Sequence, residues 1–288
     1  MNGHAVARPG LSALSVWLPL ALGAAATVAV YVPVLLSMAR EWAEFPNLSH
    51  GFAIPAISAY LVWSRRHELA AVEPSSSALG VPLLLAGLAL LLAGTLGGEP
   101  FAARLSLPLT LGGVVLFLGG TRTFALLWMS LAYLLFMVPL PYTTLKELTY
   151  QSRLFDAGIT AGALRMLGVP VLQDGVMLHL ANMTLEVADE CSSVPAIAAL
   201  VALGAAYAQL GDRPRWVRVA LILAAAPLGL LSNIVRLILT SLGAYYLGRI
   251  ALDNVIHKAN GTTVFLATVL LLFALDEALR ALSRRRRA

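Results

Sequence analysis

Long apolar stretches dominate this chain and are separated by short polar segments. Several of them approach the roughly 20 residues that a helix needs to cross a bilayer. The stretches lie at about residues 14–38, 50–63, 78–98, 105–121, 123–142, 193–210, 217–247 and 260–279. The pattern predicts an all-α fold, a polytopic membrane helix bundle of about eight transmembrane helices.

The longest polar segment runs from Thr143 to Glu190 and carries two different patterns. In its first part, Leu145 to Leu167, apolar residues recur at helical spacing with charged residues between them. These charged residues are Lys146, Glu147, Arg153 and Asp156. The pattern is typical of an amphipathic helix that lies in the membrane interface with its charges outward.

The second part of the polar segment changes to a strand pattern. Val171 to Leu178 contains an Asp174-Gly175 pair, which is a turn signal for a β-hairpin. A further short strand is expected from Met183 to Val187. We therefore predict a small outer-face β-hairpin that leads directly into Cys191. No repeat or second domain is visible, so residues 1–288 are predicted to form a single integral membrane domain.

Composition supports the membrane interpretation. The 288 residues are 59% hydrophobic and 12% charged, whereas a soluble domain carries about 25% charged residues. The net charge of +5 includes a terminal cluster, Arg284 to Arg287, beside the last apolar stretch. Such a cluster indicates contact with anionic lipid, so we expect the lipid bilayer as a partner and no nucleic acid.

The basic residues also predict an orientation. With both termini in the cytoplasm, twelve of the 20 Lys and Arg residues fall on the cytoplasmic side, as the positive-inside rule requires. Those twelve are Arg8, Arg65, Arg66, Arg122, Arg213, Arg215, Arg218, Arg280 and Arg284 to Arg287. The segment from Thr143 to Glu190 then faces outward.

In this topology, three residues with reactive or charged side chains lie at the same depth in the membrane. Cys191, the only cysteine, begins the sixth stretch at its outer end. Arg236 lies about 20 residues beyond Val217, or roughly 30 Å along a helix, which places it near the outer border. His257 precedes the eighth stretch, again on the outer side.

Each residue alone has an ordinary structural interpretation. A lone cysteine is usually a small buried apolar residue, and a histidine beside a helix is often a cap. Arg236 is different, because an arginine inside a span costs about 2.5–3.5 kcal/mol on insertion scales and marks a functional site by default.

Together the three residues predict nucleophilic catalysis without a metal or cofactor. A helix N-terminus and a neighbouring cation are expected to lower the pKa of the Cys191 thiol. His257 could take the thiol proton, and Arg236 could hold the oxyanion of a tetrahedral intermediate.

At these residues the chain resembles the exosortase/archaeosortase family of membrane transpeptidases. Its Asn-x-x-Arg motif is matched by Asn233 to Arg236, and the histidine that opens the last helix is matched by His257. A second signature, Ser49-His50-Gly51-Phe52 followed by Pro55, resembles the bacterial exosortases. The resemblance covers about residues 40–275. One departure is plain: Ser193 stands where the family commonly has glycine after Cys-Ser.

The resemblance implies a function. Such enzymes cleave membrane proteins that carry a C-terminal sorting signal, consisting of a motif, a helix and a basic tail. They form a thioester on the cysteine, here Cys191, and pass the acyl group to an acceptor. The implied location is the bacterial inner membrane, with the active site facing the periplasm and a link to exopolysaccharide production. Catalytic roles fall on Cys191, Arg236 and His257, and supporting roles on Asn233, His50 and Ser192.

Two other functions fit part of the pattern. A polytopic transporter could use Arg236 to bind an anionic substrate, although paired broken helices in a repeat are missing. A lipid-directed acyltransferase would share the thioester on Cys191 and differ only in the acyl group that it carries.

Overall fold

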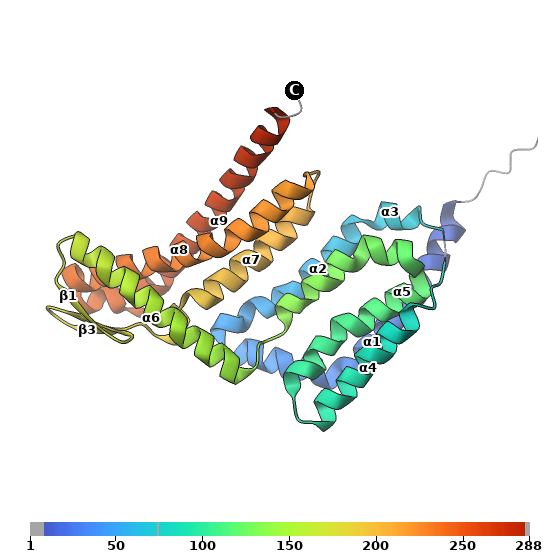
Figure 1. Ribbon diagram of the computed structural model, residues 1–288, viewed down its shortest axis with the longest axis horizontal. Helices are drawn as coiled ribbons and strands as arrows, with labels where there is room; N and C mark the ends of the chain where they lie inside the picture. The colour runs from blue at the N-terminus through green and yellow to red at the C-terminus, as the bar shows by residue number, and fades with distance from the viewer. Residues whose placement is uncertain (1–8, 74, 286–288) are drawn as a thin grey trace, which may run out of the picture. The chain divides into compact units, whose positions relative to one another are not determined.

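The computed structural model describes residues 9–73 and 75–285, and its chain divides into two compact units, Met1–Pro141 and Tyr142–Ala288. Helices dominate both units (Figure 1). Within the described residues, four helical stretches are long and apolar enough to cross a membrane, and two further apolar helices are shorter. The all-α membrane bundle predicted from the sequence is therefore confirmed. The single-domain interpretation stays a prediction.

The first unit contains five α-helices and two 3-10 helices among the described residues. They are α1 (Pro9–Glu44), η1 (Pro46–Phe52), α2 (Ala53–Ser64), α3 (Arg66–Ala70), α4 (Gly80–Leu96), α5 (Pro100–Tyr133) and η2 (Leu134–Met137). The predicted span 50–63 corresponds to the end of η1 and to α2. Since α2 has 12 residues, it extends only about 18 Å.

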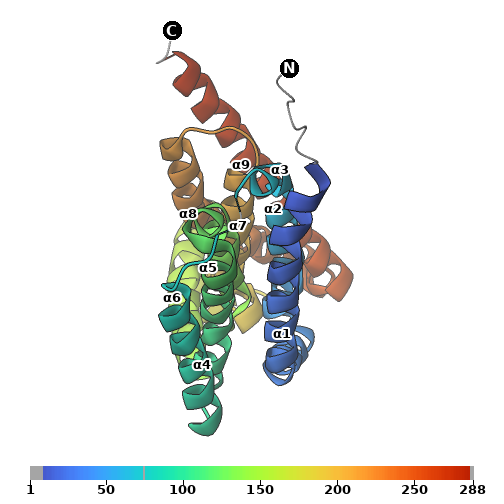
Figure 2. The same ribbon diagram turned by 90° about the vertical axis from the view of Figure 1, so that its right-hand side faces the viewer.

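Helices α4 and α5 lie against each other along their length (Figures 1 and 2). Their contact depends on glycines that recur at every seventh position of α4. These are Gly80, Gly87 and Gly94, and a Cβ on any of them would come within 2.8 Å of a backbone nitrogen of α5. Small residues at helix contacts let backbones approach closely, which is a main source of helix association in membranes.

Helix α5 contains a break at Gly120. Gly120 has φ +75° and ψ −177°, a backbone conformation that is essentially restricted to glycine. The chain turns back on itself there (Figure 1). The sequence-predicted spans 105–121 and 123–142 are thus the two arms of one interrupted helix.

The second unit carries the polar segment and the last three apolar helices. Its elements are α6 (Tyr142–Met166), β1 (Val171–Asp174), β2 (Met177–Leu180), β3 (Thr184–Glu186), η3 (Asp189–Cys191), α7 (Ser193–Gln209), α8 (Arg215–Leu247), η4 (Gly248–Leu252) and α9 (Asn254–Arg285). Apolar side chains from α7, α8 and α9 form one core, which includes Leu200, Leu221 and Leu272.

The predicted hairpin is confirmed, and it extends into a three-stranded antiparallel sheet in the order β1-β2-β3. Asp174 pairs with Met177, so the turn has two central residues, and Gly175 at the first of them has φ +57°. A positive φ at the first central residue, without one at the second, Val176, is the geometry of a type II′ turn. The loop after β2 then ties the sheet to α8, because Asn182 Nδ2 donates to the carbonyl oxygens of Ala244 and Tyr245.

A buried ion pair joins the ends of α7, α8 and α9. Asp276 has no exposed surface and accepts two hydrogen bonds from Arg213, at 2.9 and 2.7 Å. Tyr207 Oη donates to the same carboxylate at 3.0 Å, and Arg280 lies 3.0 Å from it. The carboxylate is therefore fully surrounded by donors, as a buried charge requires.

Asp276→Ala is expected to destabilise the protein, because it leaves the Arg213 guanidinium buried without its counter-charge. Loss of one partner of a buried pair costs about 3–5 kcal/mol. Thermal unfolding in detergent measures the effect as a fall in Tm. Glu277→Ala is the matched control, since the neighbouring Glu277 side chain is 72% exposed. Equal Tm values for the two variants would contradict the stabilising role of the buried pair.

Candidate active site

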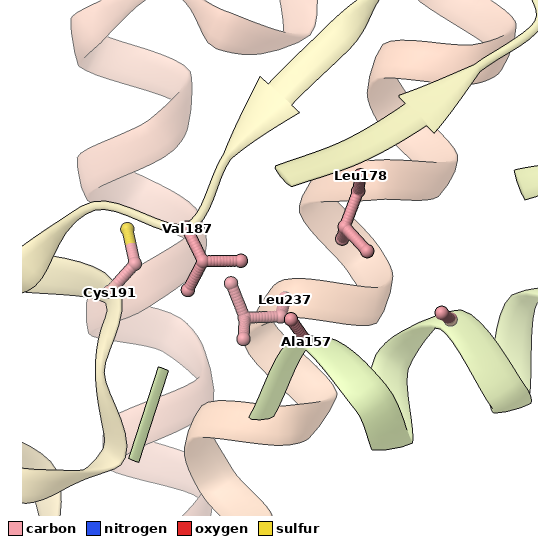
Figure 3. Packing of buried hydrophobic residues seen from close by; sticks show 6 residues of the cluster. Ala157, Leu178, Val187, Cys191 and Leu237 are labelled. Carbon is pink, nitrogen blue, oxygen red and sulfur yellow. The ribbon is translucent and has the colours of Figure 1, made fainter. Parts of the chain in front are cut away.

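Cys191 lies at the junction between the sheet and α7. The chain leaves β3, forms the single turn η3, and passes through the extended Ser192 (φ −75°, ψ 157°) before α7 begins at Ser193. The Cys191 side chain is 8% exposed and lies at the edge of an apolar cluster that includes Val187 and Leu237. Figure 3 shows its sulfur directed away from Leu237.

Arg236 reaches this thiol from α8. Its Nη2 lies 3.7 Å from Cys191 Sγ, and its Nη1 donates to the carbonyl oxygen of Glu190 at 3.3 Å. The two residues are 45 positions apart in sequence, so only the pairing of α8 with the start of α7 brings them together. Gly229 permits that pairing, because a Cβ there would lie 2.7 Å from Ile197 Cα.

The pKa of the Cys191 thiol is raised, not lowered as the sequence suggested. Burial is the largest influence, because it removes water from around the thiolate. The positive charge of Arg236 opposes this effect, and the nearby Glu190 carboxylate adds to it. At neutral pH the thiol is therefore protonated, and a base is needed to make it a nucleophile.

Asn233 holds the backbone of Cys191. Its Nδ2 donates to the Cys191 carbonyl oxygen at 2.7 Å and to Asp156 Oδ2 at 3.1 Å. Both partners are acceptors, so they fix which side of the amide carries the nitrogen. The resemblance implied a supporting role for Asn233, which stays a prediction. The structure places its amide against the cysteine main chain.

Asp156 belongs to this site and was missed by the sequence analysis. The pattern of α6 suggested an exposed charge, yet Asp156 has 0% exposure. Its Oδ2 accepts hydrogen bonds from Ser193 N at 2.8 Å and from Ser152 Oγ at 3.3 Å, besides the one from Asn233. The available signal was the run of small residues around it, Ala157 and Ala161, which are also fully buried.

Ser192 occupies the N-cap position of α7 without capping it. Its side chain is 1% exposed, and its Oγ has no hydrogen-bond partner among the described residues. Asp156 supplies the cap instead by accepting from Ser193 N. The predicted supporting role of Ser192 stays a prediction.

His257 falls in the first turn of α9, and its side chain lies outside the described residues. The residues that follow it contact the surroundings of Arg236. Asn260 Nδ2 donates to the Arg236 carbonyl oxygen at 3.2 Å and to Thr240 Oγ1 at 2.9 Å. A Cβ on Gly261 would lie 3.1 Å from Arg236 Nε. The start of α9 thus lies against Arg236, while the role of His257 stays a prediction.

His50 belongs to the first unit, where it is half-buried in η1, and its supporting role also stays a prediction. The motif around it has a packing function. Gly51 leaves room for the Trp42 indole, which a Cβ would meet at 2.4 Å, and Phe52 packs edge-on against the same ring. Trp42 is 6% exposed and donates to the Met137 carbonyl oxygen at 3.2 Å. It is therefore a core residue of this unit.

Comparison with known families identifies the chain. A family model described as transmembrane exosortase (Exosortase_EpsH) matches residues 42–274, most of its length. The chain belongs to the transmembrane exosortase family. The match begins at Trp42 and contains Cys191, Arg236 and His257. Membership carries the family's role in membrane transpeptidation and protein sorting. No curated protein and no solved structure matches this exosortase.

Arg236→Gln is expected to make the Cys191 thiol harder to ionise, because it removes the cation that opposes the effect of burial. The rate of alkylation by iodoacetamide should rise with pH through a midpoint at higher pH than in the wild type. At about pH 8 the variant should react more slowly. Since Cys191 is the only cysteine, mass spectrometry of the whole protein reports on this thiol alone.

Arg249→Gln is the matched control, because Arg249 is an exposed arginine of the same unit. Its profile should coincide with that of the wild type. An unchanged midpoint in Arg236→Gln would show that the guanidinium does not act on the thiol.

Proposed function

We propose that this exosortase is a cysteine protease and transpeptidase of the bacterial inner membrane, with both termini cytoplasmic and the active site facing the periplasm. Its substrates are exported proteins with a C-terminal motif, a membrane helix and a basic tail, and their sorting is linked to exopolysaccharide production. The chain cuts at the motif through a thioester on Cys191 and passes the acyl group to an acceptor.

The observation that carries this proposal is the contact between Arg236 and the thiol. In many cysteine and serine enzymes backbone N–H groups beside the nucleophile stabilise the oxyanion. Here the N–H groups of Cys191, Ser192 and Ser193 already donate to Ala188 O, Asp189 O and Asp156 Oδ2. Arg236, at 3.7 Å from Sγ, is the donor in position to take that part.

The acylation step follows from these positions. His257 would accept the thiol proton, and Cys191 Sγ would attack the scissile carbonyl carbon. The carbonyl electron pair would move to oxygen, where the Arg236 guanidinium stabilises the negative charge. When the tetrahedral species collapses, the C–N bond breaks and the leaving amine takes the proton from His257. A thioester remains on Cys191.

The second step returns the enzyme to its starting state. An acceptor amine or hydroxyl, or water, would attack the thioester carbon while His257 removes its proton. The C–S bond breaks, and the thiolate takes the proton back from His257. The acyl group leaves on the acceptor, or as a carboxylate if water attacks.

The membrane sets the depth at which the substrate motif lies. A basic tail is retained in the cytoplasm, and about 20 apolar residues span the bilayer. A motif that precedes such a helix therefore lies at the outer interface. This is the depth that the topology assigns to the start of α7, where Cys191 lies. A substrate helix within the bilayer would present its motif to the thiol by lateral approach.

Cys191→Ala and His257→Ala are each expected to lower processing by at least about 10³-fold, because both residues act in every bond-breaking step. The assay follows the size of a co-expressed exported protein, encoded near the gene of this chain, that ends in a motif, a helix and an arginine cluster. His179→Ala is the control, since His179 lies in β2 and pairs with Thr184. Processing that persists in Cys191→Ala would overturn the proposal.

The adduct on Cys191 separates this function from lipid acyl transfer. Mass spectrometry of enzyme that is quenched in acid during turnover should show a peptide of the substrate attached at Cys191. A fatty acyl mass at that position would assign the chain to lipid chemistry instead.

A further inference from the structure

We propose that Asp156 is a positioning residue for the reaction: its buried carboxylate holds Asn233 and the first N–H of α7, and thereby keeps the Cys191 thiol against Arg236. The expected effect on the rate of processing rests on the proposed function. The expected effect on the position and ionisation of the Cys191 thiol does not.

The place of Asp156 sets it apart from the other charged residues of α6. Arg153, one turn earlier, points to the sheet and pairs with Glu186 and Asp189, whose side chains are 59% and 65% exposed. Asp156 is instead fully buried, as are Ala157, Thr160 and Ala161 around it. No ion pair to Asp156 is found within the described residues.

One oxygen of Asp156 collects contacts from three helices. Oδ2 accepts from Ser152 Oγ of α6, from Ser193 N of α7 and from Asn233 Nδ2 of α8. Ser152 Oγ and Ser193 Oγ are also 2.6 Å apart. The other oxygen, Oδ1, is buried without a hydrogen-bond partner among the described residues.

A carboxylate is favourable at the start of α7 for a physical reason. The first N–H groups of a helix lack partners within the helix, and its N-terminus carries a partial positive charge. Asp156 satisfies the N–H of Ser193 and lies in that favourable field. Burial nevertheless raises the pKa of Asp156, and the donors from Ser193, Ser152 and Asn233 oppose the rise. A group so costly to bury indicates a task beyond packing.

Asp156 acts on Cys191 through Asn233, whose Nδ2 carries two hydrogen atoms. One hydrogen goes to Asp156, and the other goes to the Cys191 carbonyl oxygen at 2.7 Å. Asp156 thus holds the chain on both sides of Ser192, at Cys191 O through Asn233 and at Ser193 N directly. With both points fixed, the direction of the Cys191 side chain is restricted to the side where Arg236 lies.

Asp156→Ala removes the acceptor and is expected to release this restraint. A misplacement of about 1 Å in a catalytic group can cost about 10²-fold in rate. We therefore expect kcat for processing to fall about 10²-fold, with KM within about twofold because Asp156 is buried away from substrate. Asp156→Asn retains an oxygen for the same three donors and should recover kcat to within about tenfold of the wild type.

The pH dependence of Cys191 alkylation distinguishes positioning from a simple charge effect. Loss of a nearby negative charge would by itself ease ionisation of the thiol and move the midpoint to lower pH. Loss of the contact with Arg236 moves it to higher pH. We expect the higher value in Asp156→Ala and a value at or below the wild type in Asp156→Asn. This assay needs no substrate, so it stands even if the sorting proposal fails.

Asp174→Ala is the matched control, because Asp174 is an exposed carboxylate in β1 of the same unit, and it should behave like the wild type. Each variant is first checked for gel-filtration profile and Tm in detergent. If Asp156→Ala folds poorly, Asn233→Ala is measured in its place, because it removes the link from Asp156 to the Cys191 carbonyl oxygen. It should likewise lower kcat and move the alkylation midpoint to higher pH. An unchanged kcat and midpoint in Asp156→Ala, or in Asn233→Ala where it replaces that variant, would overturn the proposal.

Discussion

The contact between the Arg236 guanidinium and the Cys191 thiol is the constraint on which the second unit depends. A cation inside an apolar helix costs about 2.5–3.5 kcal/mol on insertion scales, so it must be held by polar groups. Its Nη1 meets the Glu190 carbonyl oxygen, and its Nη2 meets Sγ. Gly261 leaves α9 close enough to cover Nε. The start of α7, the last third of α8 and the start of α9 are arranged around one side chain.

The polar segment before Cys191 supplies the rest of this arrangement. Its sheet is tied to the end of α8 by Asn182, which donates to two carbonyl oxygens of the last turn, those of Ala244 and Tyr245. Its helix α6 brings Asp156 under the start of α7. Through these contacts the polar segment fixes the position of the Cys191 backbone, which a helix start alone would leave to fray.

Much of the fold could be predicted from the sequence, because its signals lie in short stretches of the chain. Apolar length predicted the spans, and the Asp174-Gly175 pair predicted the hairpin turn. Arg236 stood out because a charge in an apolar run is rare. Asp156 did not stand out. The face of α6 that packs against other helices is lined by small residues, so the spacing of large apolar residues does not reveal it. The raised pKa of Cys191 also escaped prediction, since burial at a helix start depends on the neighbouring sheet.

The raised pKa of the Cys191 thiol has a consequence for the proposed periplasmic active site. A thiolate exposed at rest would be open to oxidation, and the sulfur of a protonated, buried thiol reacts slowly. Arg236 beside it gives a cation that stabilises the thiolate only once a base removes the proton. In the proposed mechanism the nucleophile is therefore formed when a substrate motif and His257 meet at the start of α7. A protonated resting thiol limits both oxidation and wasteful hydrolysis, at the expense of requiring the base.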